Sequence, residues 1–220
     1  MARMDHSSRA RSSATRTGQS PRGAGRFIEP MLLLRTDALP SSDHWLYELK
    51  LDGYRAIAFN RQGTLHLRSR NNKDFSGRYP GVVTALATLP NDTVIDGEIV
   101  AFDEDGRPSF NALQNLGSAT APVVYYVFDV LVFAGRDVIR EPLEARRTLL
   151  ERKVLPKVSE PVRYAAALEA DLPELIASVK AQGFEGLVAK RRNSVYEPGL
   201  RSGAWQNMRV NRSQEFVIGS

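Results

Sequence analysis

One short stretch separates two segments with strand character, and it reads Lys50-Leu51-Asp52-Gly53-Tyr54-Arg55. Before it, residues 45–50 alternate between apolar and polar side chains, as a half-buried strand does. After it, residues 54–59 and 64–68 predict two strands joined by a turn at 61–63. Since an Asp-Gly pair is typical of tight turns, we expect Lys50 to end a strand beside a turn, where its side chain is held in place.

A lysine held in this way has the chemistry of a nucleophile. The ordinary pKa of a lysine is about 10.4, and burial or a neighbouring cation lowers it. Arg55 supplies such a cation, and Asp52 supplies a carboxylate that orients the amine. The alternative interpretation is structural: a strand, an Asp-Gly turn and a second strand.

The rest of the chain predicts more strands than helices. Further strands are expected at residues 94–102, 123–132, 186–190 and 215–218, and helices at 79–89, 142–154 and 171–183. Because the strands follow one another in hairpin-like pairs, the fold class is expected to be α+β with mainly antiparallel sheets.

Composition excludes several classes of protein. The 220 residues are 42% hydrophobic and 25% charged, which is typical of a globular chain. The absence of cysteine excludes disulfide scaffolds, zinc fingers and thiol nucleophiles. No apolar run reaches the ~18 to 20 residues of a membrane helix, so we expect no membrane association.

The net charge of +5 is carried by the first 26 residues, which hold six arginines and one aspartate. Residues 1–25 are poor in apolar side chains and are expected to form a disordered basic tail before a domain at 26–220. An organellar transit peptide is the alternative for this segment. A second basic concentration at residues 190–212 predicts a phosphate-bearing ligand.

Five further motifs follow Lys50 in order: Ser69–Asp74, Asp96–Val100, Tyr126–Leu131, Glu185–Lys190 and Trp205–Arg209. Together with residues 50–55 they resemble the adenylation domain of ATP-dependent DNA ligases, within the covalent nucleotidyltransferases. The likeness is greatest to the bacterial ligase D type, which serves non-homologous end joining in DNA repair and recombination. This resemblance covers about residues 28–220. It implies two mainly antiparallel sheets flanked by helices, an ATP-grasp-like core with the nucleotide cleft between the sheets.

The resemblance also implies a reaction and its residues. Lys50 would attack the α-phosphate of ATP, and the resulting lysyl-adenylate would pass to the 5′-phosphate of a DNA nick. Phe128 would stack on adenine, and the Glu48 backbone would contact its amino group. The implied nucleotide-binding residues are Glu48, Asp52, Arg55, Arg70, Glu98, Phe128, Lys190, Arg201 and Arg209. Glu98 and Glu185 would hold Mg²⁺ or Mn²⁺.

Each motif also has a structural interpretation. Periodicity alone places Phe128 in the core, and Asp96-Gly97-Glu98 alone fits a turn at an edge strand. Arg70 fits the polar exit of a hairpin, and the basic run from Lys190 fits a solvated face.

The chain departs from the family pattern in Trp205-Gln206-Asn207-Met208-Arg209, where the family has lysines at positions 207 and 209. Arg209 keeps a cation, whereas Asn207 keeps only a hydrogen-bond donor. We expect Asn207 to weaken self-adenylylation without abolishing nucleotide binding, because each positioned cation stabilises the charge of phosphoryl transfer. Asn207→Lys should speed lysyl-adenylate formation.

The implied partners are nicked or broken double-stranded DNA, an OB-fold domain that we expect to be missing from this chain, and a Ku-type end-binding protein. Without an OB-fold domain, we expect weak nick sealing. The protein is expected to be a monomer in the bacterial cytoplasm, associated with the nucleoid. Two alternatives stay open: an RNA ligase or GTP-dependent capping enzyme, and a ligase-derived nucleic-acid-binding module with little catalysis.

Overall fold

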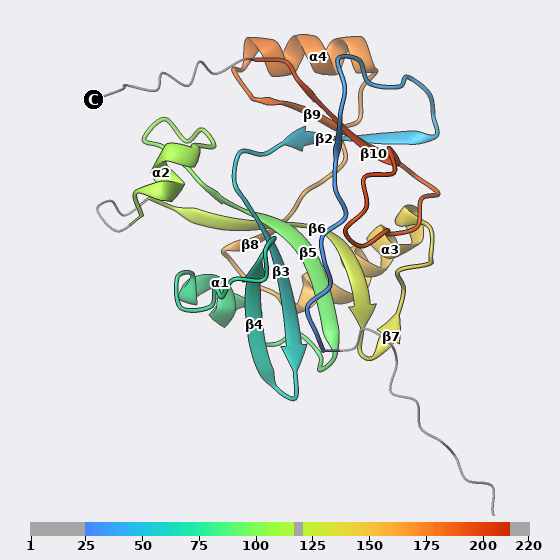
Figure 1. The fold of residues 1–220 in the computed structure, drawn as a ribbon. Coiled ribbons are helices and arrows are strands. Elements are labelled where there is room, and N and C mark those ends of the chain that lie inside the picture. Colours follow the sequence, from blue (N-terminus) through green and yellow to red (C-terminus); the bar gives the residue numbers. More distant parts are fainter. Residues whose placement is uncertain (1–24, 117–120, 212–220) are drawn as a thin grey trace, which may run out of the picture.

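Two β-sheets lie face to face with helices on their outer sides (Figure 1). This arrangement comes from a computed structural model, which describes residues 25–116 and 121–211. It confirms the expected α+β class with two mainly antiparallel sheets. The tail expected at residues 1–25, apart from Gly25, and the strand expected at 215–218 lie outside the described residues.

The smaller sheet has four strands in the order β1-β10-β9-β2. Its strands are β1 (Leu34–Arg35), β2 (Trp45–Lys50), β9 (Gly186–Arg191) and β10 (Trp205–Arg209). The β1–β10 pair is parallel, and the β10–β9 and β9–β2 pairs are antiparallel. Helix α4 (Leu172–Ala181) covers the outer face (Figure 1), where its apolar side packs against Trp45, Leu187 and Met208. The Asp171 side chain caps α4 by accepting a hydrogen bond from the Glu174 N–H, as the sequence predicted.

The larger sheet has six strands, with β4-β3-β5-β6-β7 in sequence across it and β8 parallel beside β6. Its strands are β3 (Tyr54–Arg61), β4 (Thr64–Ser69), β5 (Thr93–Ala101), β6 (Val123–Phe133), β7 (Arg136–Asp137) and β8 (Val162–Tyr164). The turn predicted at 61–63 is present, with Gln62 and Gly63 at positive φ.

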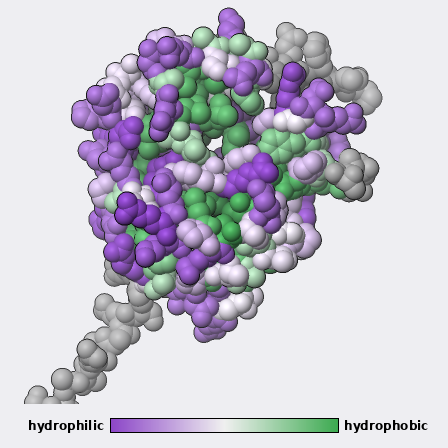
Figure 2. Space-filling view, turned by 180° about the vertical axis from the view of Figure 1, so that it is seen from behind, coloured by the Kyte–Doolittle hydropathy of each residue, from purple (hydrophilic) through white to green (hydrophobic). Residues whose placement is uncertain are grey.

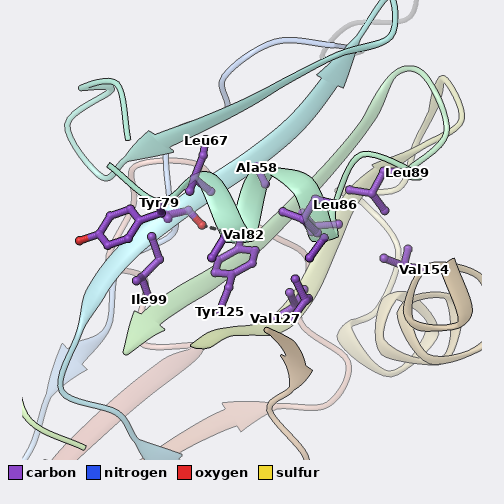
Figure 3. Close-up of a cluster of buried hydrophobic side chains, with 14 of the residues drawn as sticks. Ala58, Leu67, Tyr79, Val82, Leu86, Leu89, Ile99, Tyr125, Val127 and Val154 are labelled. Carbon is purple, nitrogen blue, oxygen red and sulfur yellow. Dashed lines mark hydrogen bonds between the residues drawn. The ribbon is translucent and has the colours of Figure 1, made fainter. Parts of the chain in front are cut away.

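The outer face of this sheet carries the largest apolar cluster of the described residues. Helices α1 (Pro80–Ala85) and α2 (Phe110–Gln114) pack there, and Figure 3 shows Val82 and Leu86 of the α1 segment over Ile99, Tyr125 and Val127. Helix α1 is shorter than the predicted 79–89. The chain tightens into i→i−3 turns after Ala85, with Leu89 N–H donating to Leu86 O, so Leu86 and Leu89 stay buried outside the helix.

A third helical segment lies beside β6. It begins as α3 (Leu143–Leu149), continues as the π-helical turn η1 (Leu150–Val154) and ends in the 3₁₀ turn η2 (Leu155–Lys157). The helix predicted at 142–154 therefore forms, but its second half is more loosely wound. No residue pattern in the sequence indicated that change.

The inner faces of the two sheets meet in a separate apolar cluster. Leu46 and Trp205 of the smaller sheet face Ile57, Val94 and Phe128 of the larger one. Seen from behind, hydrophobic residues show in recessed areas between hydrophilic ones (Figure 2). Among the residues that the structure describes, no helix is long and apolar enough to cross a membrane.

Candidate active site

Strand register on the smaller sheet gathers residues from three distant parts of the chain. Lys50 pairs with Gly186, which pairs with Arg209, and Glu48 pairs with Val188, which pairs with Asn207. Side chains two residues apart on a strand share a face. One face of the sheet therefore presents the sequence-predicted residues of three motifs, namely Glu48, Lys50, Lys190, Trp205, Asn207 and Arg209.

Lys50 lies at the end of β2, as predicted, and it is held by a carboxylate. Its Nζ is 2.5 Å from Oε2 of Glu185, and both side chains are largely buried. The second oxygen, Oε1 of Glu185, is 3.0 Å from Nε of Arg209. Glu185 thus fixes the position of the candidate nucleophile and of a neighbouring cation.

Glu48 is buried between two cations. Oε2 of Glu48 lies 2.7 Å from Nζ of Lys190, and Oε1 accepts a hydrogen bond from Arg147 of α3. The contact between Lys190 and Glu48 is an ion pair whose geometry is not that of a hydrogen bond. The Lys190 ammonium also lies 3.9 Å from the centroid of the Phe128 ring. Burial lowers the pKa of Lys190 to about 8, although Glu48 acts in the opposite direction.

Arg55 is anchored on the larger sheet. Its guanidinium donates two hydrogen bonds of 2.6 Å to the buried carboxylate of Asp96 and lies 4.6 Å from the Phe128 ring centroid. Asp96 also accepts a 2.6 Å hydrogen bond from the Tyr196 hydroxyl. That hydroxyl in turn accepts a hydrogen bond from the Met31 N–H. Because two parallel hydrogen bonds to one carboxylate fix the plane of a guanidinium, Arg55 is held in one orientation.

A β-bulge aims Phe128 at the space between the sheets. Asp96 pairs with Asp129 and the next residue, Gly97, pairs with Val127, so Phe128 is the extra residue of β6. Bulges commonly redirect a side chain next to a functional site. Phe128 is 6% exposed and so belongs to the core, as its periodicity predicted, yet its ring also lines a cavity.

Two adjoining cavities share Lys50, Arg55 and Glu98. The inner one has a volume of about 110 Å³ and is lined also by Glu48, Phe128, Lys190 and Trp205. The outer one, of about 310 Å³, is lined also by Arg35, Arg70, Arg201 and Asn207. The predicted residues Arg70 and Arg201 thus lie at the outer end. Asp52 lines a different cavity, together with Glu185 and Arg209.

Glu98 lies at the junction of the two cavities, and within residues 25–116 and 121–211 it has no ion-pair partner within 4.0 Å. Burial raises the pKa of Glu98 to about 7, although Arg55 and Lys50 act to lower it. The described residues contain no cluster of three or more histidine, aspartate or glutamate side chains that would enclose a metal ion. Glu98 and Glu185 each carry a carboxylate near Lys50, and Mg²⁺ commonly binds one or two carboxylates together with phosphate and water.

Two groups of supporting residues were not predicted from the sequence. Arg147 holds Glu48, and Tyr196 holds Asp96, which holds Arg55. Arg147 left a detectable signal, because the spacing of Leu143, Arg147, Leu150 and Val154 places it on the apolar side of its helix. A buried arginine on such a face needs a carboxylate partner.

Comparisons with known proteins agree with this geometry. A family model described as ATP dependent DNA ligase domain matches residues 30–209. The multifunctional non-homologous end joining protein LigD of Pseudomonas aeruginosa is 37% identical over 195 residues, which cover 87% of this chain and 23% of that protein. LigD of Mycolicibacterium smegmatis is also 37% identical, over 182 residues that cover 80% of this chain and 23% of that protein. The chain therefore spans less than a quarter of the length of these relatives.

Solved structures show the same fold. A mycobacterial DNA ligase D complexed with ATP and MES matches with a TM-score of 0.72 and 33% identity, covering 83% of this chain and 60% of that one. The ligase domain of Mycobacterium tuberculosis LigD matches with a TM-score of 0.71 and 32% identity, covering 83% and 59%.

Proposed function

The chain belongs to the family of ATP-dependent DNA ligase domains, and we propose that it catalyses self-adenylylation through Lys50. In this reaction the Lys50 amine attacks the α-phosphorus of ATP. A nitrogen–phosphorus bond forms, the bond to the bridging oxygen of the β-phosphate breaks, and pyrophosphate leaves. The amine must also lose its proton, and Oε2 of Glu185 at 2.5 Å is an acceptor within reach.

One observation carries the proposal: Lys50 lines a cavity together with aromatic rings, carboxylates and a second lysine. These groups are Phe128, Trp205, Glu48, Glu98 and Lys190. Phe128 offers an apolar ring for adenine to stack on, and Trp205 contributes a buried Nε1–H without a partner among the described residues. Lys190 and Arg209 supply positive charge near Lys50, and charge of that sign stabilises phosphoryl transfer.

Glu98 and Glu185 are proposed to hold Mg²⁺ or Mn²⁺. A divalent cation bound there would supply positive charge to the phosphate oxygens. For this role Glu98 must be ionised. Burial raises the pKa of Glu98 and so disfavours its charged form, whereas Arg55 and Lys50 favour it, and a bound cation would favour it further.

The proposed second stage transfers the adenylate to the 5′-phosphate of nicked or broken double-stranded DNA, and a 3′-hydroxyl then seals the strand. Arg70 and Arg201 support this stage, because both are exposed at the outer cavity and therefore accessible to a phosphate. The names of the LigD relatives suggest end joining in bacterial DNA repair as the setting. By the same analogy we propose an OB-fold domain and a Ku-type protein as partners, in the cytoplasm beside the nucleoid.

Intact mass of the purified chain tests the proposal. We expect ATP with Mg²⁺ to add one adenylyl group, pyrophosphate to remove it, and Lys50→Ala to prevent it. Lys180→Ala is the matched control, since Lys180 is exposed on α4 at the outer face of the sheet. Addition of a guanylyl group from GTP, instead of an adenylyl group from ATP, would favour a capping-type enzyme. If the chain bound ATP but gained no covalently attached nucleotide, this result would contradict catalysis by this chain and favour a nucleic-acid-binding module.

A further inference from the structure

The outer cavity is lined by arginines whose charge is not neutralised by the protein. Arg35, Arg70 and Arg201 have no carboxylate within 4.0 Å in the part of the chain that the structure describes. The other two cations of this cavity differ, because Lys50 is paired with Glu185 and Arg55 with Asp96. The outer cavity therefore carries three arginines without a carboxylate partner against one carboxylate, Glu98, and this excess of positive charge favours an anionic ligand.

Arg35 is placed there by the parallel pairing of β1 with β10 in the smaller sheet. β1 lies beside β10 with Arg35 opposite Asn207, and the Thr36 N–H donates a 3.0 Å hydrogen bond to Asn207 O. Residues opposite each other on paired strands point to the same face. The side chains of Arg35 and Asn207 are therefore neighbours on the face that also carries Lys50 and Glu48.

Arg35 supplies the outer cavity with a positive charge that β10 lacks. Arg209 is bound to Glu185, and Asn207 is neutral, so β10 itself offers no free cation to the outer cavity. Arg35 adds one from the adjacent strand. Its planar guanidinium suits two oxygens of a phosphate at once.

We propose that Arg35, together with Asn207, binds the β- and γ-phosphates of ATP and thereby the pyrophosphate leaving group. The inference rests on the proposed function. Lys50 lines both cavities, so a nucleotide with its base beside Phe128 and its α-phosphate at Lys50 extends its remaining phosphates into the outer cavity. The 5′-phosphate of DNA is the other source of the same chemistry. Arg35 lies on the same sheet as Lys50, whereas Arg70 directly follows a strand of the other sheet, and this favours the nucleotide phosphates.

The test compares Arg35→Gln with Arg152→Gln, an exposed arginine on the π-helical turn η1. In single-turnover assays with ATP and Mg²⁺, Arg35→Gln should slow lysyl-adenylate formation at least about tenfold, as loss of one positioned cation does. Pyrophosphate should also remove the adenylate more slowly. Transfer of preformed adenylate to nicked DNA should be unchanged. Slower transfer with unchanged formation would overturn the proposal in favour of a DNA phosphate.

A lysine at position 207 separates this role from a general loss of charge. Asn207→Lys should restore adenylate formation in the Arg35→Gln background by a larger factor than it speeds the wild-type chain. Equal factors in both backgrounds would contradict the proposal. Titration with inorganic pyrophosphate alone gives a readout that needs no catalysis. If the wild-type chain forms no adenylate, the proposed function fails, but weaker pyrophosphate binding by Arg35→Gln would still support this site, and unchanged binding would overturn it.

Discussion

Nζ of Lys50 lies 2.5 Å from Oε2 of Glu185, although 135 positions separate the two residues in the chain. The pairing of β2 with β9 sets this distance, because Lys50 is opposite Gly186, the residue after Glu185. A side chain at position 186 would be impossible here, since a Cβ would lie 2.0 Å from Met208 O of β10. The close approach of three strands therefore fixes both the lysine and its carboxylate.

Glu185→Gln tests the role of this carboxylate. The amide keeps the size of the side chain but removes the charge that holds Lys50 and Arg209. We expect lysyl-adenylate formation to slow by at least about tenfold, since charge-assisted hydrogen bonds are about twice as strong as neutral ones. Single-turnover labelling with ATP measures this rate. Glu174→Gln, on exposed α4 surface, is the control, and an unchanged rate in Glu185→Gln would show that the contact is only structural.

Glu98 predicts a dependence of stability on pH. Burial raises its pKa from 4.5 to about 7, so the folded protein binds this proton more tightly than the unfolded chain does. The stability it contributes is complete below about pH 4.5 and is lost as the pH rises through about 7. Glu98→Gln should remove this loss, on the order of 1–3 kcal/mol between about pH 5 and about pH 8.

Urea denaturation of both proteins at the two pH values measures that difference. Glu104→Gln, in an exposed loop, should keep the wild-type pH dependence. If the free energy of unfolding changed equally between the two pH values in wild type and Glu98→Gln, Glu98 would already be ionised in the folded protein at the lower pH.

The sequence predicted the strands and helices well where local patterns were strong. β2 has the predicted bounds, and the capped start of α4 is at Asp171. Strand β10 was missed, because only its motif was considered and its Gln, Asn and Met residues give no clear alternation. The bulge at Phe128 was not predictable either, since it depends on the register between β5 and β6.

The candidate site was partly predictable for a similar reason. Motif order predicted roles for Lys50, Glu185, Lys190 and Arg209, and the structure places these four residues close together. Sequence could not reveal that Arg147 holds Glu48, nor that Arg35 lies beside Asn207, because both depend on contacts between elements far apart in the chain.

Arg147→Met tests whether the buried pair with Glu48 supports the fold. Arg147 also donates to the carbonyl oxygens of Phe128 and Ala165, so the substitution leaves several buried acceptors without a partner. We expect a loss of about 3 kcal/mol in the free energy of unfolding, the cost of breaking a buried pair. Arg192→Met is the matched control. Its pair with Glu144 is exposed, so its loss should stay below about 1 kcal/mol. Similar losses in urea denaturation would contradict the structural role.

Phe128→Leu tests where the base binds. The ring projects from the bulge of β6 into the inner cavity, whereas the arginines of the outer cavity lie beyond Lys50. Leucine keeps the apolar contact but cannot stack on a base, and stacking contributes about 1–3 kcal/mol. We expect ATP and AMP to lose affinity equally, by about tenfold, which corresponds to about 1.4 kcal/mol.

Arg35→Gln should instead weaken the binding of ATP and leave the binding of AMP unchanged, because AMP has no phosphate beyond the α-position. Calorimetric titration distinguishes the two patterns, with Phe102→Leu as the control, since Phe102 packs against Tyr126 away from both cavities. If Phe128→Leu weakened ATP but not AMP, the ring would act on the phosphates through Lys190, which lies 3.9 Å from its centroid, and not on the base.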